Sequence, residues 1–157
     1  MENIDEIVEL DRLNMTPVIE RTGSTFDPDL RRKKIIAELQ EGAVFFSVRR
    51  AGETVAYLEY MPELHDTWNI MSLQVHPAHQ SGTVLRDLLT EGRRCLQANV
   101  PSCIRSSVHV TNQTSLRLHH KLEFVKTEEK DGRILFVTEG KILLKRLACF
   151  KKGKENG

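Results

Sequence analysis

Residues 71–89 carry the pattern that points most directly to chemistry. They read MSLQVHPAHQSGTVLRDLL: an apolar alternation ending at Pro77, a short polar loop that contains Gly82, and then an apolar helical period. A loop that runs into a helix N-terminus presents backbone N–H groups and the positive end of the helix dipole. Glycine lets a ligand approach the backbone closely. The segment therefore predicts a site that suits a pyrophosphate group.

A second informative segment lies downstream at residues 108–124, VHVTNQTSLRLHHKLEF, and it completes a resemblance. Residues 71–89 resemble the acetyl-CoA signature of the GNAT acetyltransferase superfamily: a strand with L-x-V-x-P, a loop Q/R-x-x-G-x-G/A and a leucine pair. Residues 108–124 are similar to that family's strand, N-x-x-A, helix and L-Y-x-x-x-G-F pattern. The two segments lie in the family order, and with the flanking strands the resemblance covers residues 43–147.

The resemblance implies an N-acetyltransferase that moves acetyl from acetyl-CoA to a primary amine by direct attack, without a metal. The main chain of Leu73 and Val75 would bond the pantetheine arm of the coenzyme. Asn112 would help to hold the coenzyme, and the helix that begins near Ser115 would pack beneath it. The implied pyrophosphate loop consists of Gln80, Ser81, Gly82, Thr83, Val84 and Leu85.

The chain departs from the family pattern in the loop. Gln80 fills the Q/R position, but Thr83 and Leu85 stand where the two glycines belong, and Gly82 falls between them. Side chains at these positions enter the zone of close approach, and neither residue readily adopts a positive φ. We expect coenzyme binding to be weakened.

The catalytic groups depart from the pattern as well. His119 occupies the position of a tyrosine that protonates the leaving thiolate in relatives, which makes it the candidate acid, because histidine donates a proton near neutral pH. The alternative is that His119 and His120 only cover a helix surface. Glu123 replaces the glycine of the G-F pair. The strand at 68–75 holds no acid, and the nearest candidates for a base are Glu59, Glu63, His65 and Asp66.

These departures leave a second function open: a non-catalytic GNAT-like module that binds coenzyme A weakly or not at all and acts through protein contacts. A third hypothesis is nucleic-acid binding through the lysines of residues 151–157. His76 and His79 have no Cys or acidic partners at ligand spacing, so we predict no metal site. The acceptor amine is left open between a small molecule and a protein.

The hydrophobic periods predict an α/β fold: a mostly antiparallel mixed sheet with splayed middle strands and helices on both faces. We expect one domain at residues 1–150 and a disordered basic tail at 151–157. The expected helices cover 3–14, 28–42, 84–99 and 114–122. The expected strands cover 43–50, 54–61, 68–76, 104–110, 124–127, 134–137 and 142–147, with a tight turn at Asp131-Gly132.

Composition places the chain among globular proteins. It has 157 residues, a formal net charge of +1 and a charged fraction of 29%, which gives no overall field that would attract nucleic acid or an anionic membrane. The N-terminus is acidic, unlike a signal peptide, and no apolar run approaches a membrane span. Three scattered cysteines argue against a disulfide framework. We therefore expect a cytoplasmic protein with no membrane partner, and a homodimer is left open.

Overall fold

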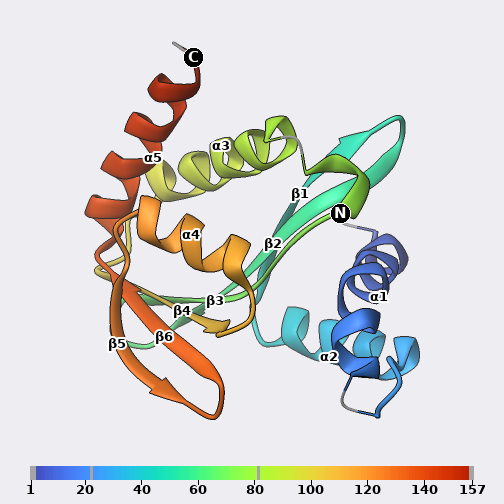
Figure 1. Cartoon of the computed structure of the whole chain (residues 1–157). Helices are drawn as coiled ribbons and strands as arrows, with labels where there is room; N and C mark the ends of the chain where they lie inside the picture. Colours follow the sequence, from blue (N-terminus) through green and yellow to red (C-terminus); the bar gives the residue numbers. More distant parts are fainter. Residues whose placement is uncertain (1–2, 22, 81, 156–157) are drawn as a thin grey trace. The chain divides into compact units, whose positions relative to one another are not determined.

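The computed structural model describes residues 3–21, 23–80 and 82–155. Five α-helices and six strands are present in these ranges (Figure 1). In chain order they are α1 (Ile4–Glu20), α2 (Pro28–Gln40), β1 (Val44–Arg50), β2 (Glu53–Glu63), β3 (Thr67–Val75), the 3-10 turn η1 (Pro77–His79), α3 (Thr83–Ala98), β4 (Cys103–His109), α4 (Gln113–Lys121), β5 (Val125–Lys130), β6 (Arg133–Thr138) and α5 (Gly140–Glu155).

The strands form one mixed six-stranded sheet in the order β1-β2-β3-β4-β6-β5. The β1–β2, β4–β6 and β5–β6 pairs are antiparallel, and β3 and β4 are parallel. This confirms the predicted α/β class and the mostly antiparallel sheet.

The ladder between the two parallel strands is short. It joins Thr67–Ile70 to Cys103–Ser106 in four residue pairs. β3 continues as a strand to Val75, and β4 continues to His109 while it stays paired with β6. The last five residues of β3 therefore lie outside the β3–β4 ladder.

The chain forms two compact units. The first comprises residues 1–61 and 72–88, and the second comprises residues 62–71 and 89–157. Three elements, β2, β3 and α3, pass from one unit to the other. The single domain expected from the sequence stays a prediction.

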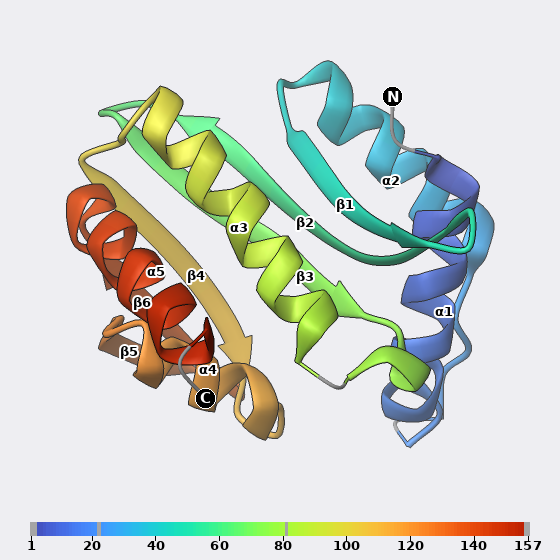
Figure 2. The same ribbon diagram turned by 90° about the horizontal axis from the view of Figure 1, so that it is seen from above.

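The first unit is built on two apolar clusters. α1, α2 and β2 together bury the first of these, and Figure 2 shows the two helices side by side next to β1 and β2. Its buried members are Ile7, Val8, Leu10, Ile35 and Tyr57. The second cluster joins the strands to the beginning of α3, and its buried members are Val48, Val55, Ala56, Val84 and Leu88.

In the second unit β4 alternates between buried and exposed residues. Ile104, Ser106 and Val108 are buried, whereas the residues between them are exposed. α4 lies against the buried face, because the His119 ring stacks on Phe136 of β6 with centroids 4.8 Å apart. Period-two alternation of this kind is what a sheet with one covered face requires.

One helix boundary and one element type predicted from the sequence are wrong. α1 continues through Pro17 to Glu20, although a proline in a helix interior removes one backbone hydrogen bond. Residues 142–147 belong to α5 rather than to a strand. Leu143 and Leu147 are both buried, and their spacing of four is the helical period.

α5 also includes most of the segment predicted to be a basic tail. The helix extends to Glu155, so residues 151–155, which we expected to be disordered, are helical. Residues 156 and 157 lie outside the described part of the chain. In the described ranges, no helix combines the length and the apolar character that crossing a membrane would take.

Candidate functional site

The segment from β3 to α3 has the predicted order of strand, turn and helix. β3 ends at Val75, η1 follows, and α3 begins at Thr83. Gly82 lies directly before α3 with a φ of +92°, a backbone region that favours glycine, and its carbonyl accepts a hydrogen bond from the Arg86 N–H at 2.9 Å. Gln80 is exposed, whereas the predicted loop residue Ser81 lies outside the described residues.

The two positions where the family pattern has glycines are helical in this chain. Thr83 and Leu85 both belong to the first turn of α3. Thr83 is exposed, Leu85 is half-buried, and Val84 between them is 3% exposed in the core. The side chain of Val84 is therefore part of the core. Its main chain, but not its side chain, is suited to contact a ligand.

The side chains of Leu73 and Val75 pack against the second apolar cluster of the first unit. Asn14, which the sequence analysis did not single out, forms hydrogen bonds with the end of β3. Asn14 of α1 donates one hydrogen bond from Nδ2 to the Val75 carbonyl at 3.0 Å and another to Gln74 Oε1 at 2.8 Å. The Val75 carbonyl thus already accepts a hydrogen bond. No motif marks Asn14, and only its place near the C-terminal end of the first amphipathic helix could have suggested the contact.

The other three predicted residues come together on α4, within the second unit. Asn112 is the N-cap of this helix, and its Oδ1 accepts a hydrogen bond from the Ser115 N–H at 3.1 Å. Ser115 in turn faces His119 one turn later, where its carbonyl lies 2.7 Å from Nδ1 of the ring. Capping by asparagine explains why the helix begins at this point.

His119 is a core residue of the second unit. Its side chain lies between Phe124 and Phe136, both with ring centroids 4.8 Å away, and the residue is 8% exposed. Its Nε2 lies 2.8 Å from Ser106 Oγ. Burial lowers the pKa of the imidazole below its usual value, although the hydrogen bond to the Ser115 carbonyl opposes this.

These contacts fix the tautomer of the neutral ring. A carbonyl oxygen only accepts hydrogen bonds, so Nδ1 carries the proton that it donates to Ser115, and Nε2 accepts from the Ser106 hydroxyl. Both ring nitrogens are therefore engaged inside the second unit. This environment is typical of a packed histidine, and the proton-donor role stays a prediction.

Glu123 stands where the family pattern has a glycine, and its backbone keeps the glycine-like conformation. Its φ is +60°, in the left-handed region that non-glycine residues seldom adopt. The Glu123 N–H bonds to the His120 carbonyl at 3.1 Å, and the carboxylate pairs with Arg146 of α5. The turn therefore has the backbone that the G-F pattern requires.

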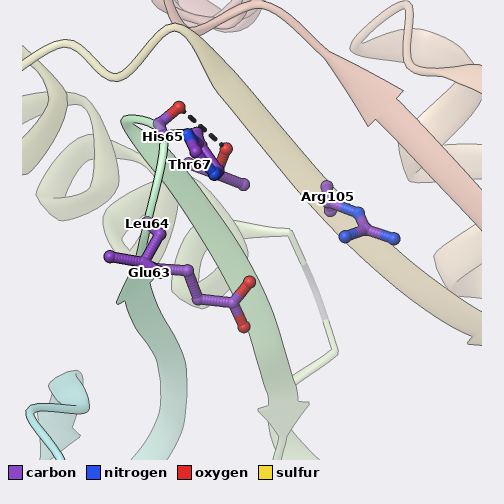
Figure 3. Close-up of a pocket in the computed structure, with 5 residues that line it drawn as sticks. All are labelled: Glu63, Leu64, His65, Thr67 and Arg105. Carbon is purple, nitrogen blue, oxygen red and sulfur yellow. Dashed lines mark hydrogen bonds between the residues drawn. The ribbon is translucent and has the colours of Figure 1, made fainter.

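Three of the ionisable candidates for a base lie around the β2–β3 turn. Glu63 and His65 line a shallow hollow of about 490 Å³ with Leu64, Thr67 and Arg105, and the Thr67 hydroxyl donates to the His65 carbonyl at 3.2 Å (Figure 3). Asp66 has a structural role, because its Oδ2 accepts from both the N–H and the hydroxyl of Ser102. The fourth candidate, Glu59, is buried in the first unit at 1% exposure.

No cluster of three or more metal-ligating side chains occurs among the described residues. His76 and His79 lie with ring centroids 5.4 Å apart, but the Nδ1 atom of His76 accepts a hydrogen bond from the Ala78 N–H at 3.0 Å. That ring nitrogen stabilises the η1 turn.

Comparison with known proteins identifies the fold. No family model matches the sequence, and no curated protein matches it. Solved structures do match. The PaiA N-acetyltransferase from Thermoplasma acidophilum has a TM-score of 0.69 at 11% identity, over 87% of this chain and 92% of that one. The ribosomal-protein-S18-alanine N-acetyltransferase from Escherichia coli has a TM-score of 0.66 at 16% identity, over 88% and 90%.

A third match, to an N-acetyltransferase from Staphylococcus aureus Mu50, has a TM-score of 0.66 at 14% identity, over 87% of this chain and 92% of that one. These likenesses extend over nearly the whole chain, and another matching structure is described as a member of the GNAT family. The chain therefore has the GNAT fold.

Proposed function

We propose that the protein is an N-acetyltransferase that transfers the acetyl group of acetyl-CoA to a primary amine. The observation that carries the proposal is the strand, turn and helix at residues 67–98, with Gly82 at a positive φ directly before α3. The residues present fit a pyrophosphate, because a positive-φ glycine permits close approach and the helix dipole favours an anion. The match to PaiA, which was crystallised in complex with coenzyme A, supports the same reading.

In the proposed reaction the amine nitrogen attacks the thioester carbonyl carbon. A new C–N bond forms, the C–S bond breaks, the amine loses a proton, and the coenzyme thiolate takes one up. The products are an amide and free coenzyme A. The five residues of β3 beyond Ile70 lie outside the β3–β4 ladder, so an extended pantetheine arm could bond to this strand as an added strand would. Leu73 and Val75 are the proposed contacts.

A second candidate function is a GNAT-like module that lacks catalysis and acts through protein contacts. It is favoured by two observations: Thr83 and Leu85 are helical where the family pattern has glycines, and both ring nitrogens of His119 are engaged in the core. Neither observation bears on the fold. The two candidates therefore differ in coenzyme binding and turnover, which are measurable.

Calorimetric titration with acetyl-CoA separates the two candidates. The proposed function predicts saturable binding and, with a panel of small amines and lysine-containing peptides, release of free thiol at a rate above the uncatalysed one. Absence of binding at millimolar acetyl-CoA would refute the enzyme. Binding without turnover across the whole panel would favour the module. The cytoplasmic location stays a prediction, and the acceptor amine and a homodimer stay open.

The loop itself provides a prediction about affinity. Because Thr83 and Leu85 place side chains where the family pattern has none, replacing both by glycine is expected to tighten coenzyme A binding by roughly tenfold. Both positions are helical, so the double variant should lose about 1 kcal/mol of stability per glycine. Titration and urea denaturation measure the two effects. Gln97→Gly, at an exposed position later in α3, is the control for helix destabilisation. Unchanged or weaker binding in the double variant would show that the loop binds in another geometry.

A further inference from the structure

The first unit contains a cluster of polar side chains, most of them ionisable, that the proposed function does not use. Two helices and two strands contribute to it. Its members are Asp11 of α1, Arg31 and Glu38 of α2, Tyr57 and Glu59 of β2, and Ser72 of β3. Three of them are carboxyl groups that are almost fully buried: Asp11 at 3% exposure, Glu38 at 6% and Glu59 at 1%. Within the described ranges, Arg31 is the one cation paired with these three carboxyl groups.

Arg31 bonds to Asp11 through Nε, and this ion pair is completed by the Tyr57 hydroxyl, which donates to the other Asp11 oxygen. Burial raises the pKa of Tyr57 well above its usual value, so the hydroxyl stays neutral and acts as a donor. Tyr57 also bonds to Ser72 Oγ at 2.9 Å. The charge of Asp11 is therefore well compensated.

The compensation does not extend to both glutamates. Arg31 Nη1 lies 3.2 Å from Glu38 Oε1, but Nη2 is 3.6 Å from Glu59 Oε1, beyond hydrogen-bond distance. Within the described part of the chain, neither carboxylate oxygen of Glu59 has a hydrogen-bond partner. A buried ionised carboxylate with no hydrogen bond carries a large desolvation cost, which a proton removes.

We propose that the Glu38–Glu59 pair carries one proton in the folded protein, and that this proton couples the docking of α2 on the first unit to pH. Glu38 lies on α2 and Glu59 on β2, so the proton is held between the helix and the strand on which it packs. It would supply the hydrogen bond that Glu59 lacks. This role is independent of the proposed acetyl transfer.

The electrostatics agree with the geometry. Burial, and next the negative charge of Glu38, raise the pKa of Glu59 from 4.5 to about 7, while Arg31 acts in the opposite direction. When α2 detaches or the chain unfolds, Glu59 enters water and its pKa returns to the ordinary value. Between these two pKa values the docked state holds a proton that the open state has released. The docked state therefore becomes less favourable as pH rises from about 4.5 to about 7, and the effect is constant above that range.

Hydrogen exchange of the α2 amides tests the coupling. Protection factors, which already correct for the intrinsic pH dependence of exchange, are measured at pH 5 and pH 8 in the full chain. In wild type they are expected to fall by up to roughly 100-fold over this range. In Glu59→Gln the fall should be reduced to less than about threefold, because glutamine keeps the shape and the hydrogen bond of the protonated acid but cannot ionise. Glu41→Gln, an exposed site just after α2, should behave as wild type.

A pH dependence that is the same in wild type and Glu59→Gln would overturn the proposal. The infrared absorption of a protonated carboxyl group provides a second measurement that needs no variant to fold. At pH 6 the wild-type protein should show it, and the band should disappear as pH rises through about 7. A wild-type spectrum without a protonated carboxyl at pH 6 would also overturn the proposal.

Discussion

Replacing Gly140 by alanine is expected to lower the free energy of unfolding by about 3 kcal/mol. Gly140 is the first residue of α5, and its backbone lies against the loop before β4. A Cβ atom at this position would come within 2.1 Å of the Pro101 carbonyl oxygen and 3.0 Å of the Pro101 ring. The obstacle is backbone, which cannot rotate away as a flexible side chain could. The loop or the start of α5 must therefore move.

Urea denaturation followed by the fluorescence of Trp68 measures the loss. Trp68 is the only tryptophan, and it is 9% exposed in the same unit as Gly140. The neighbouring Lys141→Ala, at an exposed helical site, is the matched control and should stay within about 0.5 kcal/mol of wild type. If Gly140→Ala were as stable as Lys141→Ala, the close approach of α5 to Pro101 would be refuted.

The strand, turn and helix around Gly82 could be predicted because the signals there are local. A strand period, a proline, a glycine and a helical period follow one another within residues 71–89, and the structure has the elements in that order. The turn at Asp131-Gly132 was equally local, and both residues have the positive φ that such a turn requires. Local backbone preferences decide both features, and a single sequence displays them.

The contacts that set the chemistry of individual side chains could not be predicted in the same way. Asn14 reaches Val75 across 61 positions of sequence, and Tyr57 reaches Asp11 across 46. Nothing in either residue type distinguishes a solvated polar group from one that α1 carries into the core. The helical period does indicate the burial of Asp11. It follows Ile7 and Val8 by four and three residues, so it shares their buried helix face.

The error at residues 142–147 has a different cause. A short apolar run is compatible with a strand or a buried helix, and period alone does not separate them. Gly140 precedes the run, and a glycine at that position is compatible with the start of a strand as well as with the start of a helix. Packing decides the outcome, because Leu143 and Leu147 are both buried on one face of α5. The two segments that carry the family motifs end at Phe124, so they gave no guidance on residues 142–147.

His119→Phe is expected to destabilise the second unit and, if His119 is the proton donor, to lower turnover. The substitution keeps an aromatic ring between Phe124 and Phe136, but it removes the two ring nitrogens that contact polar groups. Ser106 Oγ, on a residue that is 3% exposed, and the Ser115 carbonyl would both lose a hydrogen bond. A buried polar group left without a partner costs about 1–3 kcal/mol. Adding Ser106→Ala to the variant should restore part of the loss, because it removes the buried hydroxyl that His119→Phe leaves without its partner.

Turnover measurements on the same variants test the proton-donor prediction independently of stability. A donor to the leaving thiolate acts in the transition state, so its loss should lower kcat by about 100-fold with coenzyme A affinity nearly unchanged. His120→Phe is the control, because that side chain is exposed. Rates are compared per folded molecule, which the denaturation data supply. A kcat of His119→Phe equal to that of His120→Phe would remove the donor role and leave His119 as the residue that holds α4 on β4 and β6.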